Sequence, residues 1–415
     1  MVSDLHVDPF NRSTTPAYYR SDTNWALFDS TLAEMRKAAP NPQVVIIGGD
    51  FLAHRFEQKV RSSGLNESTV PVALNTMSRI ESAFSRAFPH AQFLVTLGNN
   101  DDPCGDYKAA GDTAYLSQLA RIWAPLVNRH GAAANFSRDF SHTASYTAHL
   151  PANLRAIVVD DVYWSLFFQP CGRSAAGMPS AQMNWFARTL FSTSSTQRSL
   201  VLMHIPPGID PSSTLLAHRF LVVPFWRDDM RKRFLDILSA NAGRISVVLT
   251  GHMHRTDFRL GSSIPMLIAP SVSPVYSNNP AFLRLQMNGD GTLHDYQMYA
   301  YDRTWSQIFD FDKAYGVEGF TPNALAAAHE RIARDPAVQD RWLNSVVADS
   351  QTYDLRGAGR AFWCAQTDLG GAYAACAGDQ RRVTFLRVAA ALAALLVVLA
   401  IVLLSMRLAR QRRRT

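Results

Sequence analysis

The chain has 415 residues, of which 47% are hydrophobic, a composition that supports a sizeable core and excludes a largely disordered protein. Its formal net charge of +7 comes from the C-terminus, because the residues from Arg381 onward include eight arginines and neither an acid nor a lysine. The remainder of the chain is close to neutral and implies no basic groove, so we expect no nucleic-acid binding.

The predicted elements alternate between strand and helix along most of the chain. Short apolar runs typical of buried strands occupy 44–47, 93–97, 156–159, 200–203 and 245–249. Stretches of helical periodicity occupy 24–39, 72–88, 181–191 and 225–239. This alternation predicts an α/β layered fold.

Later residues predict a hairpin and then helices. The runs 282–287 and 293–299 flank an Asn-Gly-Asp-Gly turn, which is typical of a β-hairpin. Residues 1–300 are interpreted as the catalytic domain, and residues 301–382 as a C-terminal helical subdomain.

An uncharged apolar run at 388–406 has arginines at both ends. Its length is close to the roughly 20 residues that cross a bilayer, so it predicts one transmembrane helix at 383–406, followed by a basic tail at 407–415. More arginines follow the span than precede it, which favours a cytoplasmic tail and a periplasmic or extracellular catalytic domain. Because the sequence opens on MVSDLHVDPF, without an apolar export signal, a tail-anchored cytosolic enzyme is the alternative.

Four cysteines are present: Cys104, Cys171, Cys364 and Cys376. The last two bracket a short loop and predict a disulfide formed in an oxidising compartment. Four buried thiols are the alternative, and the sequence leaves the connectivity open.

Metal-capable side chains follow four of the predicted strands, and a fifth such element opens the chain. The set is Asp4, His6, Asp50, Asn99, His204, His252 and His254. In α/β folds, ligands gather at the carboxyl ends of strands, and glycines there allow close approach. Imidazole, carboxylate and amide oxygen are the ligands that a pair of borderline divalent metals prefers.

This ordered set resembles the calcineurin-like metallophosphoesterase superfamily. Finer features are similar to its acid sphingomyelinase-like phosphodiesterase branch: GGDFLAH ending at His54, MHIPPG around His204, and APSVSPVYSNNPAF at 269–282. The resemblance implies a two-sheet αββα sandwich with two divalent metal ions, Zn, Mn or Fe, at one edge. It also implies a hydrolase that acts on phosphodiester or phosphoanhydride bonds.

The resemblance further implies a role for each ligand. One metal would take Asp4, His6 and His254. The other would take Asn99, His204 and His252, and Asp50 would bridge both. Two such ions, about 3.5–4 Å apart, lower the pKa of a bridging water, whose hydroxide attacks phosphorus in line.

One motif departs from the family pattern. Where the family usually has Gly-Asn-His, this chain has Gly98-Asn99-Asn100-Asp101. Asn100 can donate a hydrogen bond but cannot act as a general acid, a loss that typically costs about 10²–10⁴-fold in rate. His54 is the candidate replacement acid, and a rim histidine without a proton-transfer role is the alternative. The other histidines match no motif: His90, His130, His142, His149, His218, His294 and His329.

Several alternatives stay open. A catalytically weak metal-binding scaffold, a polyphosphatase and a phosphomonoesterase each fit parts of the pattern, and the substrate is a phospholipid, a nucleotide or a polyphosphate.

In the superfamily the Asp-x-His motif ends a buried strand, which needs about 5–6 residues. Only Met1, Val2 and Ser3 precede Asp4. We therefore expect an upstream segment that supplies this strand and an export signal.

Overall fold

A computed structural model describes residues 1–111, 113–172, 175, 177–194, 196–216, 222–261, 264–377, 389, 392–397 and 400. Its central element is a six-stranded sheet with the strand order β4-β5-β7-β8-β10-β9. The strands are β4 (Tyr146–Leu150), β5 (Leu154–Val158), β7 (Arg198–Leu202), β8 (Ile245–Thr250), β9 (Asp257–Gly261) and β10 (Ile264–Ile268). The four inner strands are parallel, and the two edge strands pair antiparallel to their neighbours. Four strands therefore end at the same edge of the sheet.

A second layer of strands packs against this sheet. It contains the parallel pair β1 (Val44–Ile47) and β2 (Gln92–Val95) and the antiparallel β11 (Ala281–Met287), β12 (Leu293–Asp302) and β13 (Thr304–Asp310). The first residues of the chain join the two parts, because Val2 bridges Ile47 and the main-chain N–H of Leu283 donates to Met1. The predicted hairpin is confirmed as β11 and β12.

Side chains of the central sheet fill two cores. Leu202 faces the core between the two sheets, whereas Val201, the residue before it, faces the opposite core. This follows from the two-residue period of a strand. Helices α6 (Met178–Phe191) and α8 (Asp228–Ala240) cover the second core, with Phe186 stacked on Phe234.

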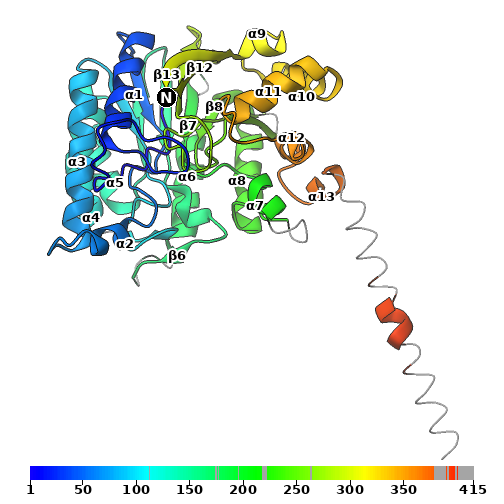
Figure 1. The fold of residues 1–415 in the computed structure, drawn as a ribbon, viewed down its shortest axis with the longest axis horizontal. Coiled ribbons are helices and arrows are strands. Elements are labelled where there is room, and N and C mark those ends of the chain that lie inside the picture. The colour runs from blue at the N-terminus through cyan, green and yellow to red at the C-terminus, as the bar shows by residue number, and fades with distance from the viewer. Residues whose placement is uncertain are drawn as a thin grey trace, which may run out of the picture.

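Further helices cover the outer faces. Asn24 caps α1 (Trp25–Ala38), and the apolar side of α3 (Thr69–Ala87) places Phe84 against Phe93 of β2. Helix α4 (Ala114–Val127) packs beside α3, and both lie along one side of the molecule in Figure 1, away from α10, α11 and α12. The α/β fold of packed sheets and helices that the sequence predicts is confirmed.

The remaining elements are short or lie near the C-terminus. They are α2 (Phe56–Ser62), β3 (Lys108–Ala109), α5 (Phe136–Thr143), β6 (Gln169–Pro170), α7 (Pro211–Leu216), α9 (Phe311–Tyr315), α10 (Pro322–Arg334), α11 (Pro336–Val346), α12 (Gly359–Thr367) and α13 (Tyr373–Cys376). The predicted disulfide Cys364–Cys376 is present and joins α12 to α13, and Cys104–Cys171 forms a second one.

The predicted transmembrane helix, 383–406, lies mostly outside the described residues, as does the whole basic tail at 407–415. Within the described part of the chain, no helix combines the length and the apolar character that crossing a bilayer requires. The membrane span therefore stays a prediction.

Candidate metal centre

The seven predicted ligands come together from the N-terminal segment and from loops that follow strands. Asp50 follows β1, Asn99 follows β2, His204 follows β7, and His252 and His254 follow β8. Asp4 and His6 lie in the N-terminal segment that pairs with β1 and with Ser271. Six of the seven side chains are buried, and His252 is partly exposed. Burying this many ionisable groups together is costly unless their charges are paired or bind a cation.

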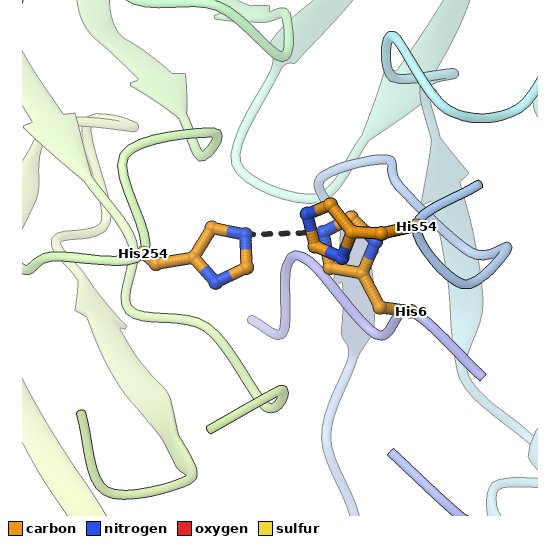
Figure 2. A group of neighbouring side chains, drawn as sticks. All are labelled: His6, His54 and His254. Carbon is orange, nitrogen blue, oxygen red and sulfur yellow. Dashed lines mark hydrogen bonds between the residues drawn. The ribbon is translucent and has the colours of Figure 1, made fainter. Parts of the chain in front are cut away.

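One half of the centre contains His6, His254 and Asp4. The Nε2 atoms of His6 and His254 lie 3.0 Å apart, and Figure 2 shows the two rings facing each other. The Oδ1 atom of Asp4 lies 3.4 Å from Nε2 of His254. These atoms come from two separate segments, the N-terminal one and the loop after β8, and lie close together.

The other half contains His204, His252 and Asn99. Nε2 of His204 lies 3.3 Å from Nδ1 of His252 and 3.2 Å from Oδ1 of Asn99. Asp50 lies between the halves, because its Oδ2 atom is 3.3 Å from His6 and 3.4 Å from His204. The structure thus brings the predicted residues together in the grouping implied by the resemblance, with Asp50 shared.

The histidines of the centre differ in protonation. Burial lowers the pKa of His6 to about 4 and that of His252 to about 3, so both rings are neutral and keep a lone pair for a metal. His204 differs: burial opposes its protonation, but the carboxylate of Asp50 raises its pKa to about 10. Asp50 therefore stabilises a positive charge on the neighbouring ring of His204, and a cation bound there would take the place of that proton. This donor set fits divalent cations, whose identity the residues leave open.

The main chain is strained at five of the seven ligands. Asp4, His6, Asp50, His252 and His254 have φ angles of 53°, 42°, 54°, 70° and 53°. Side chains other than glycine rarely adopt this left-handed region, which costs of order 1–3 kcal/mol for each residue and is concentrated at functional sites. The sequence carried no sign of this strain.

Asn100 and Asp101 hold Asp50 in place. The main-chain N–H and the side-chain amide of Asn100 donate to the two carboxylate oxygens of Asp50, at 2.8 and 2.9 Å. The carboxylate of Asp101 accepts four main-chain N–H groups, from Asp50, Phe51, Leu52 and Gly98. Asn100 thus contacts a ligand in this structure, and Asp101, which adjoins it in the quoted motif, is a positioning residue that the sequence analysis did not identify.

His54 lies beside the first half of the centre. Its ring stacks on that of His6 with centroids 3.8 Å apart, as Figure 2 shows. Its Nδ1 lies 2.7 Å from a carboxylate oxygen of Asp22, and its Nε2 lies 3.4 Å from the hydroxyl of Tyr276. Burial opposes protonation of His54, but Asp22 raises its pKa. No motif contained Asp22, and Tyr276 lies in the quoted stretch 269–282 without a role assigned to it, because the proximity of both to His54 arises only in the folded chain.

Other features lie apart from the centre. Among the described histidines that match no motif, none joins the groups of metal-capable side chains, and His218 lies outside the described residues.

A cavity of about 600 Å³ is lined by Met1, Val44 and Leu283. It lies at the opposite end of β1 from Asp50, so it is not part of the centre.

Several known proteins are similar to this chain. The family model described as calcineurin-like phosphoesterase matches residues 1–256. The relative named Sphingomyelinase phosphodiesterase D from Dictyostelium discoideum is 25% identical over 353 residues, which cover 79% of this chain and 74% of the relative. Acid sphingomyelinase-like phosphodiesterase 3b from Mus musculus is 25% identical over 396 residues, covering 83% of this chain and 82% of the relative. Among solved structures, a dimetal phosphatase from Danio rerio has a TM-score of 0.43 at 10% identity, covering 77% of this chain and 95% of that one.

Proposed function

The chain belongs to the calcineurin-like phosphoesterase family and is a hydrolase of phosphoric ester bonds, and from this premise we propose that it is a dinuclear-metal phosphodiesterase of the acid sphingomyelinase-like branch. The names of the curated relatives support phospholipid diesters as the first substrate class. Nucleotide and polyphosphate substrates are the other outcomes of a substrate test.

One observation carries the proposal. The Oδ2 atom of Asp50 lies within 3.4 Å of ring nitrogens from both halves of the centre, His6 and His204. A carboxylate oxygen in this position can serve two cations at once, which is the arrangement that two-metal hydrolysis requires.

The residues that would hold the two ions are the seven that converge here. Asp4, His6 and His254 would hold one ion, Asn99, His204 and His252 the other, and Asp50 would be shared. Divalent ions bound there would supply Lewis acidity, which activates water for attack on phosphorus and neutralises charge on the phosphoryl oxygens.

Other side chains of the centre have distinct roles in the proposal. Asn100 holds both oxygens of Asp50 and keeps that carboxylate oriented between the two halves. Asp22 engages Nδ1 of His54, so Nε2 of the same ring is the atom that would deliver a proton to the leaving oxygen.

The site of action is proposed from the sequence together with the disulfides. Residues 383–406 would anchor the chain in a membrane, with the basic tail in the cytoplasm and the catalytic domain outside it. The two disulfides support an oxidising compartment for that domain. Protease should digest the catalytic domain when it is added to cells whose cytoplasmic membrane is intact and whose outer envelope, where one is present, has been made permeable. Full protection of that domain would contradict this placement.

A substrate panel on the purified full chain tests the activity. With Mn²⁺ or Zn²⁺ supplied, we expect the diester bis-p-nitrophenyl phosphate to be hydrolysed faster than p-nitrophenyl phosphate or pyrophosphate. A chelator should abolish the turnover, and added metal should restore it. Two bound metals without turnover of any of these substrates would instead identify a metal-binding scaffold.

A further inference from the structure

Both ring nitrogens of His252 are engaged. Nδ1 faces the centre, 3.3 Å from Nε2 of His204. Nε2, on the far side of the ring, lies 3.0 Å from the phenolic oxygen of Tyr107. If Nε2 carries the proton and donates it to Tyr107, the lone pair of Nδ1 is directed into the centre.

Asp106, the residue before Tyr107, contacts Asn99 on the side that faces away from the centre. Nδ2 of Asn99 donates to a carboxylate oxygen of Asp106 at 2.7 Å, while Oδ1 of Asn99 lies 3.2 Å from Nε2 of His204. Only the oxygen end of an amide can bind a metal, and the contact with Asp106 turns that end toward the centre.

Asp106 and Tyr107 belong to a cross-linked segment, which we term the strap: residues 104–109 together with residues 167–171. Within the strap, β3 pairs in parallel with β6, and Cys104 is joined to Cys171 by the disulfide. The strap is tied to the centre by the main chain as well, since the N–H of Tyr107 donates to the carbonyl of Asn99 at 2.9 Å. The ring of Phe167 packs edge-on against that of Tyr107, with centroids 5.4 Å apart.

The other half of the centre is supported without these contacts. Nδ1 of His6 lies 3.0 Å from the carbonyl of Leu52, and the main-chain N–H of His252 donates to the carboxylate of Asp4. The outward nitrogen of His254, Nδ1, has no hydrogen-bond partner among the described residues. The strap therefore contacts ligands of one half only.

We propose that the strap positions one of the two metal sites, with Tyr107 orienting His252 and Asp106 orienting Asn99. The proposal rests on the proposed function, because it requires two metal sites. Partners of this kind fix the orientation of a ligand, and their loss typically costs about 10–100-fold in metal affinity. Loss of strap contacts should therefore weaken one metal-binding step and leave the other unchanged.

Metal titration of the full chain tests the proposal. Metal-free wild type, Tyr107→Phe and Asp106→Ala would each be titrated with Mn²⁺ by calorimetry, and bound metal would be counted by equilibrium dialysis. In both variants we expect two binding steps, one of which is weakened about 10–100-fold. The double substitution Cys104→Ser with Cys171→Ser should weaken the same step.

Tyr146→Phe is the matched control, because it removes a buried phenol that bonds to the main chain of Val95 and contacts no ligand. Its two binding steps should match those of wild type. Unchanged steps in both Tyr107→Phe and Asp106→Ala would overturn the proposal, as would an equal weakening of both steps or the same weakening in Tyr146→Phe. A wild-type chain that binds no Mn²⁺ would instead overturn the proposed centre, and the role of the strap with it.

Discussion

Asp50 is the residue on which the contacts of the centre converge. Its main-chain N–H is held by Asp101, its two oxygens accept hydrogen bonds from Asn100, and its Oδ2 faces both His6 and His204. Burial opposes its ionisation, but the nearby His204 and His6 lower the pKa of its carboxyl well below the usual value. Asp50 is thus a fixed negative charge beside the neutral ring of His6 and the positively charged ring of His204.

Replacing Asp50 by Asn tests this shared role. The substitution keeps the shape but removes the charge. The amide nitrogen must then face either the main-chain N–H of Asn100 or the ring nitrogens of His6 and His204. We expect fewer than two bound Mn²⁺ ions per chain and a loss of at least about 10²-fold in kcat, the size typical of a lost electrostatic group. Full metal content with full activity would contradict the ligand assignment. Asp139→Asn, at a partly exposed carboxylate that pairs with Arg138, is the control.

Asp101 carries a second prediction, about stability. An Asn at this position offers one acceptor oxygen where the carboxylate serves four buried main-chain N–H groups. Each buried donor left unpaired costs about 1–3 kcal/mol, so we expect Asp101→Asn to lower the free energy of unfolding by about 2–4 kcal/mol. Urea unfolding of the metal-free protein measures this change, and a loss below about 0.5 kcal/mol would contradict the role.

At the scale of elements, the turns after the strands create the centre. These turns hold Asp50, His252 and His254 in the left-handed region, and glycines next to them supply the room that such turns need. Gly251 is the first residue after β8. A Cβ atom added to Gly251 would clash with Ser3 and lie 2.8 Å from an oxygen of Asp4. The close approach of β8 to the N-terminal segment thus requires glycine at this position.

Gly251→Ala tests that requirement. We expect the added methyl group to displace Ser3 and Asp4, because its position overlaps with the side chains of the N-terminal segment. This displacement should lower both the melting temperature and the affinity for Mn²⁺. Gly243→Ala, in the turn before β8, is the matched control, since a Cβ there meets nothing within 4 Å. Equal behaviour of the two variants would show that close packing at Gly251 does not shape the centre.

At the scale of the whole molecule, the C-terminal helices dock on the edge strand β9 through a buried polar group. The carboxylate of Asp257 accepts hydrogen bonds from Gln366 of α12 and Trp342 of α11, and it pairs with Arg259 at 3.1 Å. Asp257 and Arg259 are both buried. This contact connects the helices that precede the predicted membrane span to the sheet that carries His252.

Asp257→Ala should therefore destabilise the fold strongly. Removal of one partner leaves the buried charge of Arg259 uncompensated, a change that typically costs 3–5 kcal/mol. Urea unfolding would measure the loss, and the double variant Asp257→Ala with Arg259→Met should recover part of it because no charge stays buried. The exposed pair of Arg138 and Asp139 provides the control: Asp139→Ala should leave the unfolding midpoint unchanged. A similar effect from both single variants would refute the docking role of Asp257.

The local pattern of the chain determined the elements and the candidate ligands. Short continuous runs of β-branched and apolar residues predicted β1, β2, β5, β7 and β8, because a strand that is buried on both faces carries apolar side chains at successive positions. Boundaries were less certain: the helix predicted from 225 begins at Asp228, since Trp226 is held in a bridge to Ser165. The strands β4, β9, β10 and β13 and the helix α4 were not predicted.

Only the tertiary structure decided which groups meet. The distance of 2.7 Å between Asp22 and His54, the contact of Tyr107 with His252, and the four N–H groups on Asp101 join residues that lie up to 145 positions apart. The candidate ligands leave a local sign, because five of the seven follow a strand or a glycine, and Asp4 and His6 form the Asp-x-His element that opens the chain. Their supporting partners could not be predicted, because a hydrogen bond between distant loops depends on the packing of the whole sheet and leaves no periodic trace along the chain.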